Sequence, residues 1–355
     1  MKDALQCPSL FQAYEKYFRI GAAINGRMPA DPAYNALICR HYNSITADNQ
    51  MKPMFVMDRE ATLAKGDPLH AAVKFDWVDS LLSWAKANGI TVRYHTLVWH
   101  NQTPRWFFAK DWSDAEGAEP ASKETMLARL ENYILDVMNH VNTAFPGLVY
   151  TWDVVNEAIE PDQGAPGLYR TRSPWYMTCR EDFLPVAFRA ARRGQAPGQT
   201  LCYNDYNAFD PVKRDAIIGL LKKLQAENLV DTMGMQGHYV MDEMDISLCE
   251  TAARAYAALG LKVQVTELDI HCNSGSDETQ QKLAQLYGDY FAMLRKLKDE
   301  GIDIEAITFW GVTDADSWLT GFRRETSYPL LFTRDKKAKP AYDAVLACVN
   351  GDGSV

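Results

Sequence analysis

The sequence lacks the long apolar segments that cross membranes. None of its hydrophobic runs approaches the ~18–20 residues that a spanning helix needs. Residues 1–6 also lack the apolar segment and the cleavage site of a secretory signal peptide. If Met1 is the native start, we therefore expect a cytoplasmic protein; if a signal peptide has been removed, we expect a secreted one.

Motifs that define several other classes of protein are also missing. No Cys-x-x-Cys or Cys-x-x-His spacing occurs, so neither a zinc site nor a disulfide framework is predicted. No glycine-rich phosphate loop opens a helix after a predicted strand, and there is no Gly-x-Ser-x-Gly elbow and no His-Glu-x-x-His helix. We expect free thiols, which are typical of a reducing compartment, at Cys7, Cys39, Cys179, Cys202, Cys249, Cys272 and Cys348.

The charge balance excludes another group of partners. A net charge of −9 would repel nucleic acids and anionic membrane surfaces, so we expect neither as a partner. The 355 residues contain 47% hydrophobic and 23% charged residues, which is ordinary for a globular protein with a large core. We expect one domain over residues 1–355 with a core at about 18–349; the sequence leaves the oligomeric state open.

Short apolar stretches rich in β-branched residues alternate with stretches of helical period. Helical patterns occur at residues 75–88, 123–144, 211–228 and 277–300, and Ser122 precedes the second of them as an N-cap. Eight alternating units favour a closed (β/α)8 TIM barrel, of class α/β, over an open doubly wound sheet. The predicted strands are residues 18–24, 44–49, 91–99, 149–157, 200–207, 232–239, 262–270 and 306–313.

Polar and aromatic residues gather at the carboxyl ends of these strands, where the catalytic groups of α/β barrels lie. A metal site built from His95, His238 and a carboxylate is conceivable, but each histidine comes singly from its own strand. We therefore expect neither a metal nor another cofactor. The polar strand ends are residues 48–52, 99–102, 156–157, 204–207, 236–239, 267–269 and 314–318.

Two of these strand ends carry a glutamate, Glu157 and Glu267. An acid at the end of a buried strand is costly unless it is paired or used. Two carboxyls beside indoles, amides and other hydrogen-bonding side chains are the equipment of glycoside hydrolysis. A non-catalytic sugar-binding module is the rival interpretation, although binding alone does not need an acid/base pair.

Five segments together resemble glycoside hydrolase family 10, and the similarity extends from about residue 18 to residue 349. They are TADNQMKP at 46–53, HTLVWH at 95–100, WDVVNEA at 152–158, VTELD at 265–269 and FWGVTD at 309–314. The resemblance implies a (β/α)8 fold and a retaining endo-1,4-β-xylanase that acts on xylan or xylo-oligosaccharides. A β-1,4-glycanase that also accepts cello-oligosaccharides or aryl glycosides stays open as an alternative.

The resemblance also implies roles for the two carboxyls. Glu157 would be the general acid/base and Glu267 the nucleophile, with the two groups roughly 5–5.5 Å apart. The reaction would pass through a covalent glycosyl-enzyme. Glu157 would need a raised pKa while Glu267 is anionic and a lower one after glycosylation. If Asn156 and Glu157 both contact one sugar, the strand must bend or bulge at its end, so we expect irregular backbone there.

Further residues receive supporting roles from the same resemblance. An Asp269–His238–Glu267 hydrogen-bond chain would hold the nucleophile ionised, because alternate residues of a strand share one side. Asn156 would bond the sugar 2-hydroxyl, and Trp310 and Trp318 would close over the sugar that is attacked. The remaining substrate-binding predictions are Asp48, Asn49, Lys52, His95, Trp99 and Gln102 on the glycone side, Tyr206 and Asn207 on the aglycone side, and Gln236 beside His238.

The sequence departs from the usual family pattern around these positions. Asp48 stands where glutamate is commoner, Gln50 replaces another frequent acid, and Tyr94 replaces a small residue. Leu319 occupies a position where arginine is common, and the following loop, residues 320–328, is unusual. These changes affect the expected subsite preferences and leave the expected reaction unchanged.

Several tryptophans lie outside the five segments. Trp77 and Trp84 fall on the apolar side of a predicted helix, so we expect both in the core. Trp106, Trp112 and Trp175 fit outer sugar-binding platforms and plain packing equally well.

Overall fold

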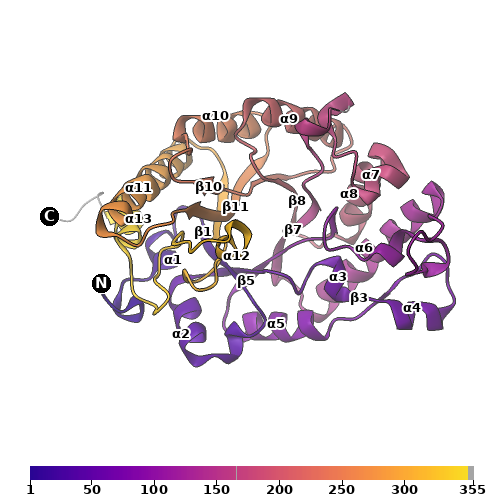
Figure 1. Cartoon of the computed structure of the whole chain (residues 1–355), viewed down its shortest axis with the longest axis horizontal. Helices are drawn as coiled ribbons and strands as arrows, with labels where there is room; N and C mark the ends of the chain where they lie inside the picture. Colours follow the sequence, from indigo (N-terminus) through magenta and orange to yellow (C-terminus); the bar gives the residue numbers. More distant parts are fainter. Residues whose placement is uncertain (165, 351–355) are drawn as a thin grey trace.

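The computed structural model describes residues 1–164 and 166–350. Eight parallel strands close into a barrel, because β1 is hydrogen-bonded to β2 on one side and to β12 on the other (Figure 1). The predicted (β/α)8 barrel is therefore confirmed. Its strands are β1 (Arg19–Ile24), β2 (Ser44–Ala47), β5 (Thr91–Tyr94), β7 (Val149–Asn156), β8 (Thr200–Asp205), β9 (Thr232–Met235), β11 (Lys262–His271) and β12 (Ile304–Phe309).

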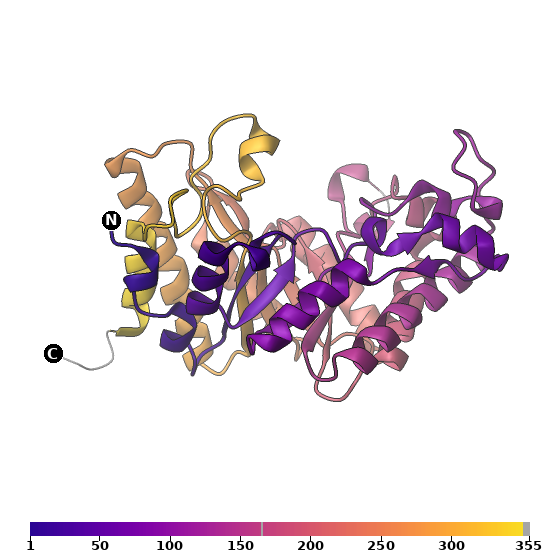
Figure 2. The same ribbon diagram turned by 90° about the horizontal axis from the view of Figure 1, so that it is seen from below.

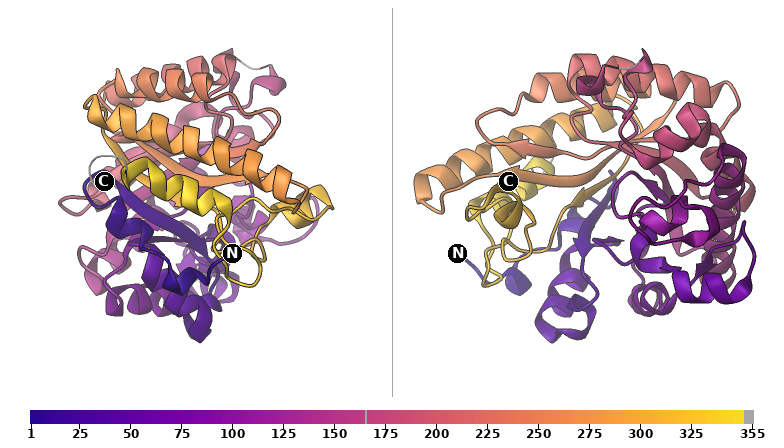
Figure 3. Two further views of the ribbon diagram at one scale, coloured as in Figure 1. Left: turned by 90° about the vertical axis from the view of Figure 1, so that its left-hand side faces the viewer. Right: turned by 45° about the vertical axis from the view of Figure 1, so that its right-hand side comes forward.

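Helices surround the barrel, and several of them begin at a residue whose side chain caps the helix. Ser122 accepts a hydrogen bond from the Thr125 N–H, as predicted, and Ser276 caps α11 in the same way. The last helix, α13, packs along α11 (Figure 3). The principal helices are α2 (Pro32–His41), α5 (Asp76–Ala87), α6 (Lys123–Ala144), α8 (Phe183–Gly194), α9 (Pro211–Gln225), α10 (Ile246–Ala257), α11 (Asp277–Asp299) and α13 (Pro340–Asn350).

Two predicted strands are interrupted. Gly237 has φ +83, a conformation that favours glycine, and it separates β9 from β10 (His238–Val240). Residues 95–97 leave the ladder between β5 and β6 (Val98–Trp99). Shorter elements are α1 (Leu10–Ala13), α3 (Pro53–Val56), β3 (Met57–Asp58), α4 (Arg59–Lys65), β4 (Ala72–Val73), α7 (Pro174–Cys179), α12 (Leu319–Arg323) and seven 3-10 turns. In Figure 2, α12 stands out from the body of the barrel.

The tryptophan predictions had mixed outcomes. Trp77 is 61% exposed, so its assignment to the core is wrong, and Trp84 is only partly buried. Trp106, Trp112 and Trp175 are buried, which makes them packing residues and not platforms. Trp77 is the second residue of α5 and lies beside the buried face of the helix, which consists of Val78, Leu81, Leu82 and Ala85.

Other features of the structure agree with what the sequence predicts. The seven cysteines are all unpaired, and none of the helices in residues 1–164 and 166–350 is long and apolar enough to cross a membrane. The core also contains the buried side chains of Met126, Met138, Met233 and Met235.

Candidate active site

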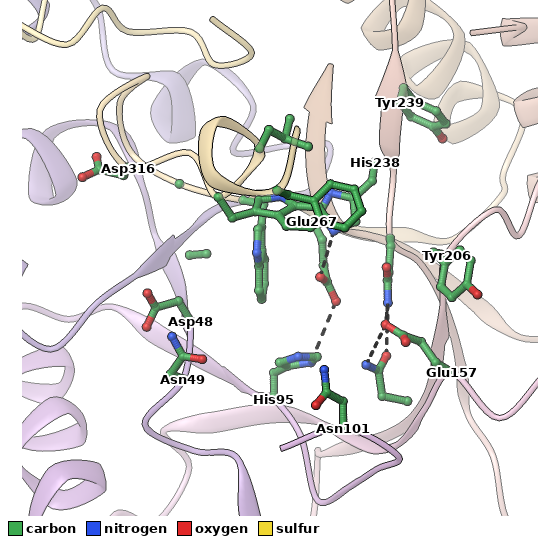
Figure 4. A pocket seen from close by; sticks show the side chains of 18 of the residues that line it. Asp48, Asn49, His95, Asn101, Glu157, Tyr206, His238, Tyr239, Glu267 and Asp316 are labelled. Atoms are coloured by element: carbon green, nitrogen blue, oxygen red, sulfur yellow. Dashed lines mark hydrogen bonds and ion pairs between the residues drawn. The ribbon is translucent and has the colours of Figure 1, made fainter. Parts of the chain in front are cut away.

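A cleft of about 970 Å³ opens at the carboxyl ends of the barrel strands. In Figure 4, Asp48, Asn49 and Asp316 lie toward one end and Tyr206 and Tyr239 toward the other, with the two glutamates between them. The predicted residues that line the cleft are Asp48, Asn49, Lys52, His95, Trp99, Gln102, Asn156, Glu157, Tyr206, Asn207, Gln236, His238, Glu267, Trp310 and Trp318. Asp269 is fully buried behind His238.

Glu157 occupies a constrained position at the end of β7. Its backbone has φ +58, a left-handed conformation that costs free energy in a non-glycine residue. The register of β7 against β8 also shifts between Asp153 and Val155, so the predicted irregular backbone is confirmed. This conformation allows the side chains of Asn156 and Glu157 to hydrogen-bond each other at 3.2 Å instead of pointing to opposite faces.

Two further side chains, in addition to Asn156, fix the Glu157 carboxyl. Trp99 donates its indole N–H to Oε2 at 3.0 Å, and Gln236 donates its amide to Oε1 at 2.9 Å. Burial raises the pKa of Glu157, and the buried Asp205 carboxylate raises it further, against the lowering effect of these hydrogen bonds. Glu157 is thus biased toward its protonated form.

Glu267 has the opposite electrostatic environment. Burial alone would raise its pKa, but His95, His238 and Arg93 more than offset this and lower it to about 2. The predicted chain is confirmed, because His238 contacts Glu267 Oε2 through Nε2 at 3.1 Å (Figure 4) and Asp269 Oδ1 through Nδ1 at 2.8 Å. Burial would lower the pKa of His238, yet Asp269 and Glu267 raise it to about 10. An imidazolium therefore faces a carboxylate.

An ion pair that the sequence reasoning missed lies beneath these groups. Arg93 donates to Asp153 Oδ2 at 2.6 Å, and both side chains are fully buried. His95 Nδ1 lies 2.8 Å from the same oxygen, so it carries the proton. Burial lowers the pKa of His95, which keeps the ring neutral at neutral pH. Arg93 and Asp153 fall inside strands that read as apolar, and only their pairing across β5 and β7 identifies them.

Asn204 is a second missed residue, although the sequence placed it at a polar strand end. Its amide nitrogen donates to Asn156 Oδ1 at 2.9 Å and to Glu267 Oε1 at 2.8 Å. Its amide oxygen accepts from the Thr266 hydroxyl at 2.6 Å. Gly234 leaves the space for this amide, since a Cβ there would lie 2.5 Å from Asn204 Oδ1. Asn204 thereby links the residues around both glutamates.

The end of the cleft that contains Asp48 and Asn49 holds a group of hydrogen-bonded polar side chains. Lys52 donates to Gln102 at 2.9 Å and to Asn49 at 3.3 Å, and its ammonium lies 4.9 Å above the Trp99 ring. Burial raises the pKa of Asp48 to about 6, although Lys52 opposes the shift. These side chains present donors and acceptors at fixed positions, as recognition of hydroxyl groups requires.

The opposite end is built around Arg170, which sequence reasoning missed. Arg170 donates to the Glu157 carbonyl at 2.9 Å, to the Tyr206 hydroxyl at 2.8 Å and to Glu160 at 2.9 Å. The Lys213 ammonium lies 3.3 Å from the centre of the Tyr206 ring. Cationic groups thus hold Tyr206 from two sides. A lone arginine in an irregular loop gives no sequence signal of this role.

One wall of the cleft is apolar. Trp318, 38% exposed, donates its indole N–H to Asp269 at 2.9 Å and lies 5.0 Å from the His238 ring. Phe322 of α12 packs on Trp318 at 4.8 Å and is 68% exposed. Leu319, which stands where the family commonly has arginine, lines the same wall.

The part of the chain that the structure describes contains no cluster of three or more His, Cys, Asp or Glu side chains suited to a metal ion. What the cleft offers is two carboxyls with opposite electrostatic bias, surrounded by amides and indoles. A (β/α)8 barrel with this equipment on its rim has the fold and site of a glycoside hydrolase.

Comparison with known proteins identifies the family of glycoside hydrolases. The family model for glycosyl hydrolase family 10 matches residues 9–348, and the chain belongs to this family. It is 45% identical over 353 residues to endo-1,4-beta-xylanase B of Butyrivibrio fibrisolvens, covering 98% of this chain and 54% of that protein. The chain thus spans about half the length of this curated relative.

Solved structures agree with this assignment. A two-module fragment of endo-1,4-beta-D-xylanase 10B of Clostridium thermocellum, complexed with xylohexaose, has a TM-score of 0.89 at 32% identity. That match covers 98% of this chain and 69% of that chain. An intracellular xylanase of Thermoanaerobacterium saccharolyticum, complexed with xylotriose, has a TM-score of 0.83 at 33% identity and covers 96% and 98%.

Proposed function

We propose that this chain is a retaining endo-1,4-β-xylanase in which Glu157 is the acid/base and Glu267 the nucleophile. The observation that carries the proposal is the opposite bias of two carboxyls in one cleft. Burial and Asp205 favour the protonated form of Glu157, whereas His238 and its neighbours favour the ionised form of Glu267. An acid and a nucleophile are what the first step of retaining glycoside hydrolysis requires.

In that first step Glu157 gives its proton to the glycosidic oxygen as the bond to the sugar breaks. The Glu267 carboxylate attacks the anomeric carbon from the other face and forms a glycosyl ester. Asn204 and His238 hold the two oxygens of Glu267, at 2.8 and 3.1 Å, so that the carboxylate is aimed before the substrate arrives. Asn156 is placed to bond the sugar 2-hydroxyl.

The second step reverses the role of Glu157. Ester formation removes the negative charge of Glu267, which had contributed to the raised pKa of Glu157. Glu157 then releases its proton and can accept one from water, and that water hydrolyses the ester at the anomeric carbon. The two inversions of configuration together give retention.

The cleft suits a chain of neutral sugars. Indole and phenyl faces can stack on the apolar faces of sugar rings, and the amides and Lys52 can bond their hydroxyls. We assign the Asp48, Asn49, Lys52 and Gln102 side to the glycone and the Tyr206 and Asn207 side to the aglycone. The substrate we propose is xylan or xylo-oligosaccharides.

We further propose that the chain forms a single catalytic domain and acts in a reducing compartment. Seven unpaired cysteines support the second point, because such thiols persist where disulfides do not form. In the cytoplasm, short imported xylo-oligosaccharides would be the substrate, since polymeric xylan does not enter cells.

Two substitutions test the assignment of the glutamates. Glu267→Ala should abolish turnover, and azide should restore it with formation of a glycosyl azide of inverted configuration. Glu157→Ala should lose xylan hydrolysis yet keep activity on aryl xylosides whose leaving groups need no proton. The control is Glu131→Ala, which removes an exposed carboxylate on α6 and should change neither activity.

Product analysis on xylan, xylo-oligosaccharides and cello-oligosaccharides tests the substrate class. Equal turnover of the glucose-based series would favour the broader β-1,4-glycanase. Binding of xylo-oligosaccharides without any products would favour the sugar-binding module. Full xylan hydrolysis by Glu157→Ala would show that Glu157 is not the acid/base.

A further inference from the structure

A second hollow, the Trp77 groove, lies outside the active-site cleft. It has a volume of about 470 Å³, and its most prominent feature is Trp77, whose side chain is 61% exposed. A large aromatic residue left in water beside a hollow is a recurrent sign of a binding site. The residues lining the groove are Gly26, Pro29, Ala30, Asp76, Trp77, Ser80, Leu81 and Trp84.

The groove belongs to the catalytic face of the barrel. In a (β/α)8 barrel each helix runs back against its strand, so helices begin on the face where strands end. Asp76 and Trp77 are the first two residues of α5, and residues 26–30 follow β1 directly. Trp84 ties α5 to its neighbour α2, because its indole N–H donates to Asn35 at 2.8 Å (Figure 1).

One loop separates the groove from the glycone end of the cleft. Asn25 and Met28 line the cleft, whereas Gly26 between them lines the groove. Trp77 packs against this loop, since a Cβ on Gly26 would lie 3.5 Å from its ring. Gln50 completes the connection: with its amide oriented to satisfy both neighbours, it accepts from the Gly26 N–H at 3.0 Å and donates to Asp48 at 3.1 Å.

The chemistry of the groove fits a neutral sugar chain. An exposed indole gives a flat apolar surface for the face of a pyranose ring, and the Asp76 carboxylate and Ser80 hydroxyl can accept hydrogen bonds from sugar hydroxyls. No arginine or lysine lines the groove, which disfavours anionic polymers. A glycan that leaves the glycone end of the cleft reaches this surface after crossing one loop.

We propose that the Trp77 groove is an additional binding site for the substrate polymer, in which a β-1,4-linked xylose chain stacks on Trp77 beyond the glycone end of the cleft. The inference rests on the proposed function. Because the site makes no contact with the reacting sugar, it contributes to the binding of long chains and not to the chemical step.

The test compares Trp77→Ala with Leu63→Ala, which removes another exposed apolar side chain from the short helix α4. Trp77→Ala should raise KM on soluble xylan about fivefold, as expected for loss of one exposed stacking contact. kcat on xylan and kcat/KM on an aryl xylobioside, which fills only the cleft, should stay unchanged. In affinity electrophoresis through xylan-containing gels, Trp77→Ala should be retarded less than the wild type and Leu63→Ala.

The possible outcomes separate the two proposals. An active wild type whose KM on xylan and gel retardation are unaffected by Trp77→Ala would overturn the groove inference alone. Equal losses on xylan and on the aryl xylobioside would also overturn it, because they would indicate a structural role for Trp77. A wild type that hydrolyses no xylan would overturn the proposed function, and the groove inference with it.

Discussion

His238 should carry a positive charge at neutral pH, and this charge should keep Glu267 ionised. In His238→Asn the imidazolium is lost, whereas the burial that opposes ionisation of Glu267 remains. The pKa of Glu267 should therefore rise from about 2 toward its ordinary 4.5, with His95 and Arg93 still lowering it. Glu267 must be ionised to attack. The acid limb of the pH profile of kcat/KM should therefore lie at higher pH in the variant than in the wild type.

The structure sets the size of this effect. A rise from about 2 to the ordinary 4.5 would span about 2.5 pH units, or about 3 kcal/mol of interaction between the carboxylate and its surroundings. The depressed pKa of Glu267 gives stability that is present above pH 4.5 and lost as the pH falls toward 2. The raised pKa of His238 gives stability that is present below pH 6.5 and lost as the pH rises toward 10.

The assay is kcat/KM against pH on an aryl xyloside with a good leaving group, which makes the rate insensitive to Glu157. Chemical denaturation across pH 6.5–10 adds a second readout: wild-type stability should fall there and that of His238→Asn should not. His70→Asn, which removes a half-exposed histidine paired with Asp67, is the matched control. The reasoning is refuted if the His238 ring titrates near 6.5 by NMR, or if the acid limb does not move in His238→Asn.

Three further changes follow from individual contacts. Asp205→Asn removes a charge that raises the pKa of Glu157, so the basic limb of kcat/KM on xylan should move to lower pH. Gly234→Ala should push Asn204 off its partners and lower kcat on xylan about a hundredfold. Ser122→Ala should lower the free energy of unfolding by ~1 kcal/mol in urea denaturation without changing activity, because it removes only the N-cap of α6.

The first two of these changes each have a clear contrary result. Gly219→Ala, on α9 with no atom near its missing Cβ, is the control for Gly234→Ala and should not lower activity. Equal activities of the two alanine variants would contradict the role given to Asn204. A basic limb that stays in place in Asp205→Asn would show that Asp205 does not raise the pKa of Glu157.

The sequence predicted the barrel because the evidence for it is local. Each strand and helix has its own periodicity, and Ser122 marks a helix start within four residues. The proposed catalytic pair could also be found, since parallel strands bring their carboxyl ends to one rim. Polar side chains at those ends, including Glu157 and Glu267, therefore lie close together on the same rim.

The His238–Asp269 chain could be anticipated for a similar reason. Alternate residues of a strand lie on one side, so the side that holds Glu267 also holds Asp269. The irregular backbone at Glu157 could be predicted from the same alternation. Adjacent residues of a strand can share a face only where the strand becomes irregular. Both inferences needed only the strand register and the residue types.

Tertiary structure decided what depends on pairs of residues far apart in the chain. Arg93 and Asp153 are acceptable inside the barrel only because they neutralise each other across 60 residues. Arg170 acquires its role from Tyr206 and Glu160, which no local pattern connects to it. The exposure of Trp77 was decided in the same way. Periodicity placed it on the apolar side of a helix, but the barrel buries its neighbour Val78 and leaves the Trp77 side chain in solvent.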